Sequence, residues 1–213
     1  WGNMKLFKLV RTVALLGLSV ASLSQASILP ENDLHLFDDI NRESNIDEKT
    51  FNDILDHAEK FYQPLAKMHK VILYVGRNWE DPKVNAWASR SMRFWTIGMY
   101  GGLARRPEVT PDGFALVACH ELGHLFGGFP FVKFPFVTVS DEGQADYYAT
   151  QACARYIWAD QLDRNAEAKE TVDPIAKEAC DTSWESEKDR NLCYRSANAG
   201  YSLAQLLATE PQD

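Results

Sequence analysis

The sequence predicts an α+β domain, in which a small sheet packs beside one central helix and the C-terminal part is mainly helical. Apolar side chains recur at helical spacing across residues 49–61. Three runs rich in β-branched and aromatic residues, 71–75, 85–89 and 93–99, indicate strands. A helix bounded at residues 110–128 follows them. Helices that precede and follow a cluster of strands are typical of the α+β class.

Residues 4–26 have the pattern of a secretory signal peptide. A basic start precedes an apolar stretch at residues 12–23 and a small-residue end. We expect cleavage before Ser27, with cleavage after Ala21 as the alternative. The apolar stretch falls short of the roughly 20 residues that an uncleaved membrane anchor needs. The mature chain, residues 27–213, is expected to form a single domain in a bacterial periplasm or outside the cell.

The charge balance excludes two classes of partner. The formal net charge is −8, and removal of the signal peptide takes away Lys5, Lys8 and Arg11 but no acidic residue, which leaves −11. A chain this acidic is repelled by nucleic acids and by anionic membranes, so neither is expected as a partner. The charge favours solubility and a cationic or neutral peptide as ligand, and no stable membrane insertion is expected after cleavage.

The segment before the first strand is predicted to contain a polar arm or short helix at residues 30–48 and an amphipathic helix at residues 49–61. His57 and His69 lie within and after this helix. Neither has a partner at metal-ligand spacing, so both are interpreted as ordinary surface or core histidines.

The strands are predicted to form a sheet next to the central helix. Residues 71–75 are interpreted as a buried strand that ends at Gly76, and residues 78–83 as a turn. The connection at residues 103–107 contains two arginines and is expected to be exposed. Three aromatic side chains are expected in the core or on a sheet face, with substrate contact as the alternative: Trp87, Phe94 and Trp95.

The central helix contains the pattern H-E-x-x-H, at His120, Glu121 and His124. Thr110 is expected as its N-cap, with Pro111 at the first helical position. Residues four apart share one face of a helix, so both imidazoles can bind one cation, with Glu121 beside the same open site. The pattern therefore predicts the zinc-binding helix of a hydrolase.

A third ligand is expected downstream, where Glu142 and Asp146 lie four residues apart at the start of a second predicted helix. Glu142 would complete a His, His, Glu set that leaves a fourth position for water, and Asp146 would accept the other ring proton of a ligating histidine. One Zn²⁺ per chain is therefore expected. The alternative is a solvated acidic first turn that complements the helix dipole.

These residues also resemble those of a known family. His120-Glu121-x-x-His124 and Glu142-x-x-x-Asp146 resemble the motifs of the gluzincin metallopeptidases. Two upstream segments, Asn85-Ala86-Trp87-Ala88 and Thr96-Ile97-Gly98-Met99, resemble strands of the family of HtpX and the CAAX prenyl endopeptidases. The resemblance covers residues 71–158 and implies a zincin-like fold, with strands just ahead of the zinc helix and an edge strand that holds an extended substrate.

This sequence differs from that family's usual pattern in two ways, which limit what the resemblance implies. Only seventeen residues separate His124 from Glu142, whereas the family usually carries a longer insertion there. No transmembrane helices like those of its integral members are predicted. A small, exported, non-membrane member, or a separate compact gluzincin lineage, fits both departures.

The resemblance and the ligand set together imply an exported zinc-dependent endopeptidase that acts on peptides or unfolded proteins. Glu121 is expected to act as general base, taking a proton from a zinc-activated water and passing it to the leaving amine. Two alternatives remain open, namely a catalytically silent zinc-binding envelope or interaction protein and a zinc amidase that acts on cell-wall peptides. An oxyanion donor is expected among six side chains: Tyr147, Tyr148, Tyr194, Arg195, Asn198 and Tyr201.

The loop at residues 129–137, between the predicted ligands, is unusually aromatic. It is interpreted as a core plug that fixes the two zinc helices or as a hydrophobic wall of a substrate pocket. The second helix is expected to continue through Trp158. Two further helices, at residues 174–179 and 197–208, are expected to flank an irregular segment.

The four cysteines of a predicted exported chain indicate disulfides. Cys180 and Cys193 bracket a polar loop and are the preferred pair. Cys119 and Cys153 remain, but Cys153 follows Asp146 by seven residues, or about 10 Å of helix. That distance exceeds disulfide reach unless the helices cross favourably. A bond from Cys153 to the C-terminal loop, with Cys119 free, is the alternative.

Overall fold

The computed structural model of the chain describes residues 26–29, 32–34, 44–134 and 137–208. Apart from Ala26, the predicted signal peptide lies outside the described residues, as does most of the predicted arm that follows it. Among the described residues, we find no helix that combines the length and the apolar character needed to cross a membrane.

The elements follow the predicted α+β order. The strands are β1 (Ala26–Ser27), β2 (Ile72–Asn78), β3 (Ala86–Arg90), β4 (Phe94–Tyr100), β5 (Phe131–Phe134) and β6 (Val137–Ser140). The helices are α1 (Glu48–Met68), α2 (Gly101–Ala104), α3 (Pro111–Phe126), α4 (Glu142–Tyr148), a π-helical turn η2 (Ala149–Cys153), α5 (Ala154–Ile157), α6 (Leu162–Glu167), a 3-10 turn η3 (Ala168–Glu170), α7 (Pro174–Ser183) and α8 (Glu187–Leu207). The α+β class is thereby confirmed.

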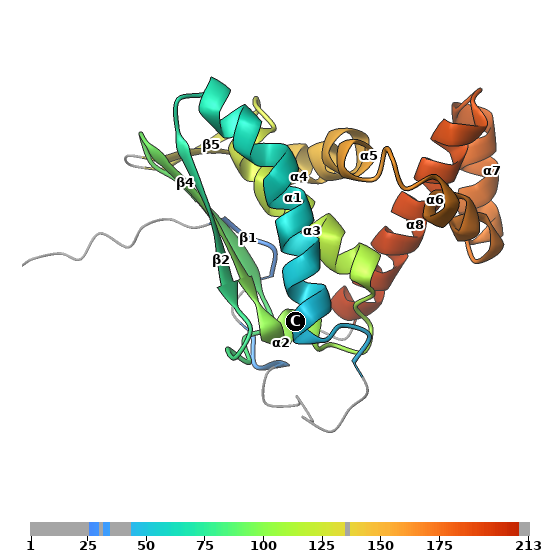
Figure 1. Ribbon diagram of the computed structural model, residues 1–213, viewed down its shortest axis with the longest axis horizontal. Helices are drawn as coiled ribbons and strands as arrows, with labels where there is room; N and C mark the ends of the chain where they lie inside the picture. Colours follow the sequence, from blue (N-terminus) through green and yellow to red (C-terminus); the bar gives the residue numbers. More distant parts are fainter. Residues whose placement is uncertain (1–25, 30–31, 35–43, 135–136, 209–213) are drawn as a thin grey trace, which may run out of the picture.

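The larger sheet has the strand order β1-β3-β4-β2, in which β2 and β4 are parallel and the other pairs antiparallel. Figure 1 shows this sheet at one side of the molecule, α1 and α3 beside it, and α6 to α8 on the far side. The face toward α1 and α3 carries buried Leu73, Val75, Ile97 and Met99. Burial of these apolar side chains against the helices forms the core.

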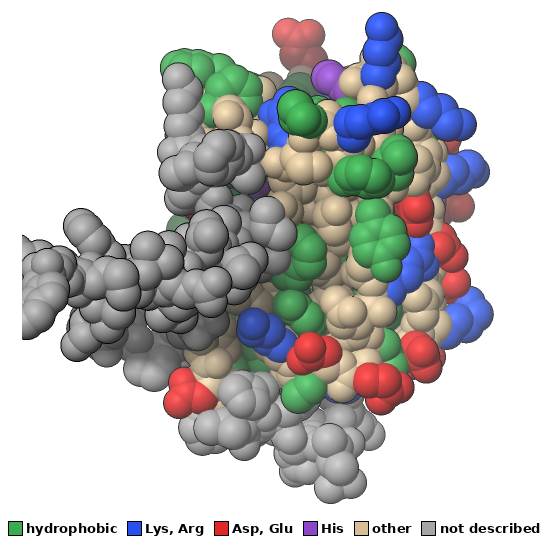
Figure 2. Space-filling view, turned by 90° about the vertical axis from the view of Figure 1, so that its left-hand side faces the viewer, with side chains coloured by type: hydrophobic (Ala, Val, Ile, Leu, Met, Phe, Trp, Pro, Cys, Tyr) green, Lys and Arg blue, Asp and Glu red, His purple; other side chains and the backbone are tan. Residues whose placement is uncertain are grey.

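The opposite face of the sheet is open, so the strand predicted to be buried at residues 71–75 is buried on one face only. Side chains alternate between the two faces of a strand, and Ile72, Tyr74 and Phe94 are exposed. Figure 2 views the molecule from this side and shows exposed hydrophobic side chains on it, among basic and acidic ones. On β4, the indole of Trp87 lies directly over Gly98. A Cβ added to Gly98 would lie 2.2 Å from the indole nitrogen, so no larger residue fits there.

Helix α1 extends the predicted residues 49–61 in both directions. Its N-cap is Asp47, whose carboxylate accepts a hydrogen bond from the Thr50 amide at 2.7 Å. His57 bonds the carbonyl of Ile157 at 2.6 Å, and the ring of His69 packs against Trp95. Both histidines have packing or hydrogen-bonding roles, in agreement with their interpretation as ordinary residues.

The connection at residues 103–107 is not the exposed loop that its two arginines suggested. Residues 101–104 form the buried helix α2, and the backbone of Pro82 packs so closely on it that a Cβ on Gly102 would lie 1.9 Å from the Pro82 oxygen. Arg106 is only 5% exposed and pairs with Glu108 at 2.9 Å. Gly101 and Gly102 allow the close packing, because neither has a Cβ. The ion pair with Glu108 compensates the cost of burying the Arg106 guanidinium.

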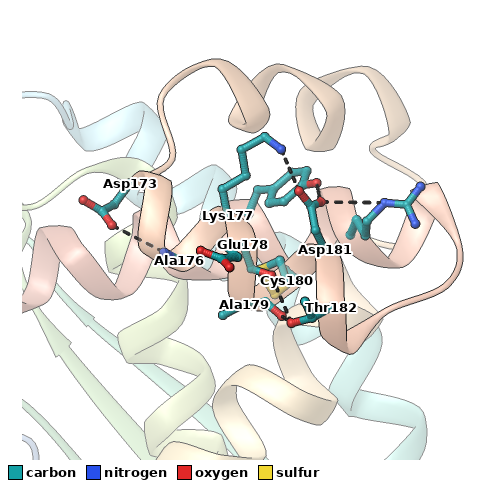
Figure 3. The surroundings of a disulfide bond; sticks show 11 residues. Asp173, Ala176, Lys177, Glu178, Ala179, Cys180, Asp181 and Thr182 are labelled. Atoms are coloured by element: carbon teal, nitrogen blue, oxygen red, sulfur yellow. Dashed lines mark hydrogen bonds and ion pairs between the residues drawn. A yellow bond between two sulfur atoms is a disulfide. The ribbon is translucent and has the colours of Figure 1, made fainter.

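The C-terminal part is helical, including the segment predicted to be irregular. Ser186 is the N-cap of helix α8, and its hydroxyl accepts from the Asp189 amide at 3.1 Å. The predicted disulfide between Cys180 and Cys193 is present, with the two Cα atoms 5.7 Å apart, and it joins α7 to α8. Figure 3 shows Cys180 on α7, near the ion pair of Lys177 and Asp181.

Candidate metal centre

Helix α3 places His120 and His124 one turn apart on a buried face. As predicted, Thr110 caps the helix by accepting from the Gly113 amide at 3.1 Å, Pro111 occupies the first turn, and Gly127 ends it. The helix is apolar nearly all round, so its polar side chains enter the interior with it. Glu121 and His124 are fully buried, and His120 is 5% exposed. Buried polar groups require partners, and these partners define the site.

The outer ring nitrogens of both histidines are fixed by hydrogen bonds. His120 Nδ1 lies 2.8 Å from Asp146 Oδ1, and His124 Nδ1 lies 2.8 Å from the carbonyl oxygen of Ser140. A carbonyl and an ionised carboxylate only accept, so each Nδ1 carries the hydrogen. In the neutral rings, each Nε2 therefore presents a lone pair.

Helix α4 brings Glu142 to these lone pairs. Asp141 caps α4 by accepting from the Gln144 amide at 2.8 Å, and the Gln144 side chain donates to the Gly127 carbonyl at 2.7 Å. Gly123 allows the backbones of α3 and α4 to touch, since a Cβ there would lie 2.8 Å from the Ala145 oxygen. Helix α4 is therefore held against the C-terminal half of α3, with Glu142 in its first turn.

Three ligand atoms form a nearly equilateral triangle. His120 Nε2 and His124 Nε2 are 3.1 Å apart, and Glu142 Oε2 lies 3.1 Å and 3.3 Å from them. A tetrahedral ion with ligands at about 2.05 Å has ligand-to-ligand edges of about 3.3 Å. Two imidazole lone pairs and a carboxylate oxygen repel at this spacing unless a positive charge lies between them. The His120, His124 and Glu142 group could therefore hold a metal ion.

The pKa values of the three groups agree with a site that favours positive charge. Burial alone would lower the pKa of His120, but the hydrogen bonds to Asp146 and Glu142 outweigh it and raise the value to about 10. Burial acts to lower the pKa of His124 as well, but the bond to Glu142, the charge of Glu121 and the Ser140 carbonyl together raise it. Burial acts to raise the pKa of Glu142, yet the two imidazoles lower it to about 2. A metal ion would compete with protons for this position.

Glu121 lies beside this triangle in an unusual state for a carboxylate. It is 0% exposed, and neither of its oxygens has a hydrogen-bond partner among the described residues. Burial raises its pKa to about 7, although His120 and His124 act in the opposite direction. The backbone N–H of Ile28 also lowers this pKa without forming a hydrogen bond of normal geometry. A buried acid with a pKa near neutrality can accept and return a proton.

A cavity of about 530 Å³ opens next to the ligands. Its polar lining includes His120, Glu142 and Asp146, and its apolar walls come from α3, from the C-terminal half of α8 and from residues 27–29. The Glu142 and Asp146 side chains are 60% and 74% exposed, so solvent reaches the ligands from the α4 side. The arrangement provides a metal-binding group beside a mainly apolar pocket.

The oxyanion donors expected from the sequence do not gather at this cavity. Arg195 bonds Asp112, Tyr194 bonds Asp181, and Asn198 bonds the carbonyl of Ala168. Tyr148 bonds Tyr62. None of the six expected side chains lines the cavity.

In the aromatic loop between the ligands, the side chains that the structure describes, at residues 129–132, do not form a core plug. The described part of the loop includes the hairpin of β5 and β6, and Phe129 and Phe131 are 81% and 37% exposed. Neither of these side chains lines the cavity. The hairpin instead contributes the Ser140 carbonyl, which accepts the hydrogen bond from His124 Nδ1. A backbone carbonyl is present in every residue, so the sequence gives no signal for this contact.

The second disulfide, Cys119 to Cys153, is present, with the Cα atoms 5.5 Å apart. The condition set for this pair, a favourable crossing of the two helices, is met, and the alternative bond from Cys153 to the C-terminal loop is wrong. Helix α4 and the π-helical turn η2 cross α3, and the crossing brings Cys153 back to Cys119. Two disulfides fit an oxidising compartment.

Comparison with protein-family models, with curated proteins and with solved structures finds no match to this chain. The geometry of the site therefore carries the functional argument.

Proposed function

We propose that the protein is an exported zinc-dependent endopeptidase of the gluzincin type, with a zincin-like fold. The observation that supports this most directly is the triangle of His120, His124 and Glu142 beside the unpartnered carboxylate of Glu121. The His, His, Glu donor set is the one that catalytic zinc sites use, whereas structural zinc sites favour cysteines. All four cysteines here form disulfides.

The residues of the chain divide the work of peptide hydrolysis as follows. Asp146 and the Ser140 carbonyl orient the two histidines, and Glu142 supplies the negative charge of the ligand set. A bound zinc ion would polarise the scissile carbonyl and acidify a water molecule. Glu121 takes the proton of that water and gives it to the leaving amine.

The test compares hydrolysis of unfolded casein and of a quenched peptide library by the protein and by Glu121→Gln, with zinc measured in both. We expect stoichiometric zinc in both and a loss of activity of about 10²–10⁴-fold in the variant, because the general base is removed. Glu178→Gln makes the same change on α7, away from the site, and should keep full activity.

The other outcomes separate the alternatives. Protein without zinc, or His120→Ala that still binds zinc fully, would contradict the ligand assignment. Zinc in both proteins with no hydrolysis by either, even after the release of residues 27–29 described below, would favour a catalytically silent zinc-binding protein. Cleavage of cell-wall peptides in preference to casein would indicate the amidase.

A further inference from the structure

The N-terminal strand β1 lies where the sheet meets the metal centre. It pairs antiparallel with β3, with Ala26 opposite Ala88 and Ser27 opposite Trp87, and the Ile28 amide donates to the Ala86 carbonyl at 3.4 Å. Figure 1 shows β1 along the side of the sheet that faces α3. In the strand order β1-β3-β4-β2, the edge of β3 would be open to any other extended peptide if β1 were absent.

A single buried amide holds the segment that follows β1. Asn85, 6% exposed, accepts from the Ser27 hydroxyl at 2.8 Å and from the Leu29 amide at 3.2 Å. It also donates to the Leu29 carbonyl at 3.0 Å. Two of these three bonds go to backbone groups. Hydrogen bonds to backbone groups recognise an extended main chain whatever its side chains, as when a peptide strand adds to the edge of a sheet.

The same residues cover the catalytic side of the site. Ser27, Ile28 and Leu29 line the cavity together with His120 and Glu142. The Ile28 amide faces Glu121, which is fully buried, whereas Glu142 is 60% exposed. A metal ion could therefore reach its ligands while no substrate reaches the base. A general base must lie within hydrogen-bond reach of the proton that it takes, so access to Glu121 decides whether the site can work.

We propose that residues 27–29, which remain in the chain after either predicted signal cleavage, occupy the peptide-binding groove of the metal centre and hold it closed from within the same chain. The groove is the edge of β3, the Asn85 side chain and the apolar cavity. Its ligands are extended peptides that place small and branched apolar side chains as Ser27, Ile28 and Leu29 do. Activity requires that the segment leave β3. This inference rests on the proposed function for its catalytic consequence but not for its binding consequence.

The test locks or releases the segment in the full chain. Ile28→Cys with Ala86→Cys places two thiols on paired strands, and both positions lie in the chain after either predicted signal cleavage. Oxidation ties the segment to β3, and mild reduction frees it. The parent protein under the same reductant controls for the native disulfides. Ile28→Pro removes the amide that donates to Ala86, and Ile28→Ala, which keeps that amide, is the matched control.

Binding is measured in the zinc-loaded Glu121→Gln background, so that no probe is hydrolysed. The probe is a fluorescent peptide with the sequence of residues 25–30, Gln-Ala-Ser-Ile-Leu-Pro. A groove that its own segment fills nine-tenths of the time shows an apparent affinity about tenfold weaker than a free groove. We therefore expect Ile28→Pro to bind the probe at least about tenfold more tightly than Ile28→Ala. The locked form should bind none, and its reduction should restore binding.

Equal binding by the oxidised and reduced forms, or no binding by any form, would overturn the inference and make β1 a fixed strand of the fold. Hydrolysis of casein is followed in parallel with Glu121 intact. Probe binding that follows the lock without hydrolysis would sustain the inference and contradict the peptidase. Hydrolysis at the same rate in the oxidised and reduced forms would contradict the inference and support the peptidase.

Discussion

Two buried charged clusters lie on helix α3, and they differ in how fully the chain satisfies them. Near the start of the helix, Asp112 receives two hydrogen bonds from Arg195, at 2.7 Å and 2.9 Å. The same guanidinium donates to Gln161 and to Asn165, each at 2.8 Å, and stacks over the ring of Trp158. This cluster is complete without any ligand, which is the pattern of a structural anchor.

The second cluster lies eight to twelve residues further along α3 and is incomplete. Its two Nε2 atoms and Glu142 Oε2 converge at 3.1–3.3 Å, and both oxygens of Glu121 have no hydrogen-bond partner among the residues that the structure describes. Interiors leave polar groups unpaired only at a cost in stability. The contrast indicates that α8 is anchored through Arg195, whereas the second cluster is kept for a ligand.

The largest effect on folding is expected from Arg195→Ala. Removal of one partner from a buried charge network leaves the others unpaired, so we expect a loss of about 3–5 kcal/mol in the free energy of unfolding. Arg164 also pairs with Asp112, at 2.9 Å, but is half exposed, so Arg164→Ala should cost at most about 1 kcal/mol. Urea unfolding of the metal-free proteins measures both. Equal losses would show that the first cluster is not the anchor described here.

The second cluster was the easier of the two to predict from sequence, because its signals are local. The cap at Thr110 and the four-residue spacings of His120 with His124 and of Glu142 with Asp146 are each set by the geometry of one helix. The first cluster joins Asp112 to residues more than forty positions away. No periodicity reports such a contact, so Arg195 was considered only as an oxyanion donor.

The remaining errors have the same cause. Burial of Arg106 depends on the backbone of Pro82 packing against Gly102, and the Cys119–Cys153 bond depends on how two helices cross. The position of Ile28 near Glu121 depends on a strand pairing across about sixty residues. One missed element did have a local signal. Ser186 followed by Asp189 is a helix start, and it contradicted an irregular segment there.

The cost of the incomplete cluster can be measured through Glu121→Gln in the metal-free protein. The pKa of Glu121 is about 7 in the folded state against 4.5 unfolded, so the folded state favours the protonated acid. Below about pH 4.5 both states are protonated and the substitution should change little. As pH rises toward 7 the native carboxylate is increasingly penalised, so the variant should gain relative stability of about 3 kcal/mol and then stay constant.

Unfolding by urea from pH 4 to 8 in the presence of a chelator follows this difference. Glu178→Gln, which makes the same change on the exposed surface of α7, is the matched control. A flat difference for Glu121→Gln would show that the carboxylate has a partner in solution, and the contrast between the two clusters would lose its main support.

The smallest effect on folding and a clear effect on binding are expected from Asp146→Asn. Asp146 bonds His120 Nδ1 at 2.8 Å, but its side chain is 74% exposed, so its removal should change the stability of the metal-free protein by less than about 1 kcal/mol. Partners that orient a ligating histidine typically contribute about 10–100-fold to metal affinity. We therefore expect zinc affinity to fall by that factor, measured by competition with a chelating dye.

Asp53→Asn, on the exposed surface of α1, is the matched control and should leave zinc affinity unchanged. If Asp146→Asn also left it unchanged, His120 would be oriented by the packing of α3 alone. A loss of folding stability without a loss of zinc affinity would instead show that Asp146, like Arg195, stabilises the fold. A loss of affinity with the fold intact is the result that separates a ligand-binding cluster from an anchor, because only the former is built around an atom that the chain does not supply.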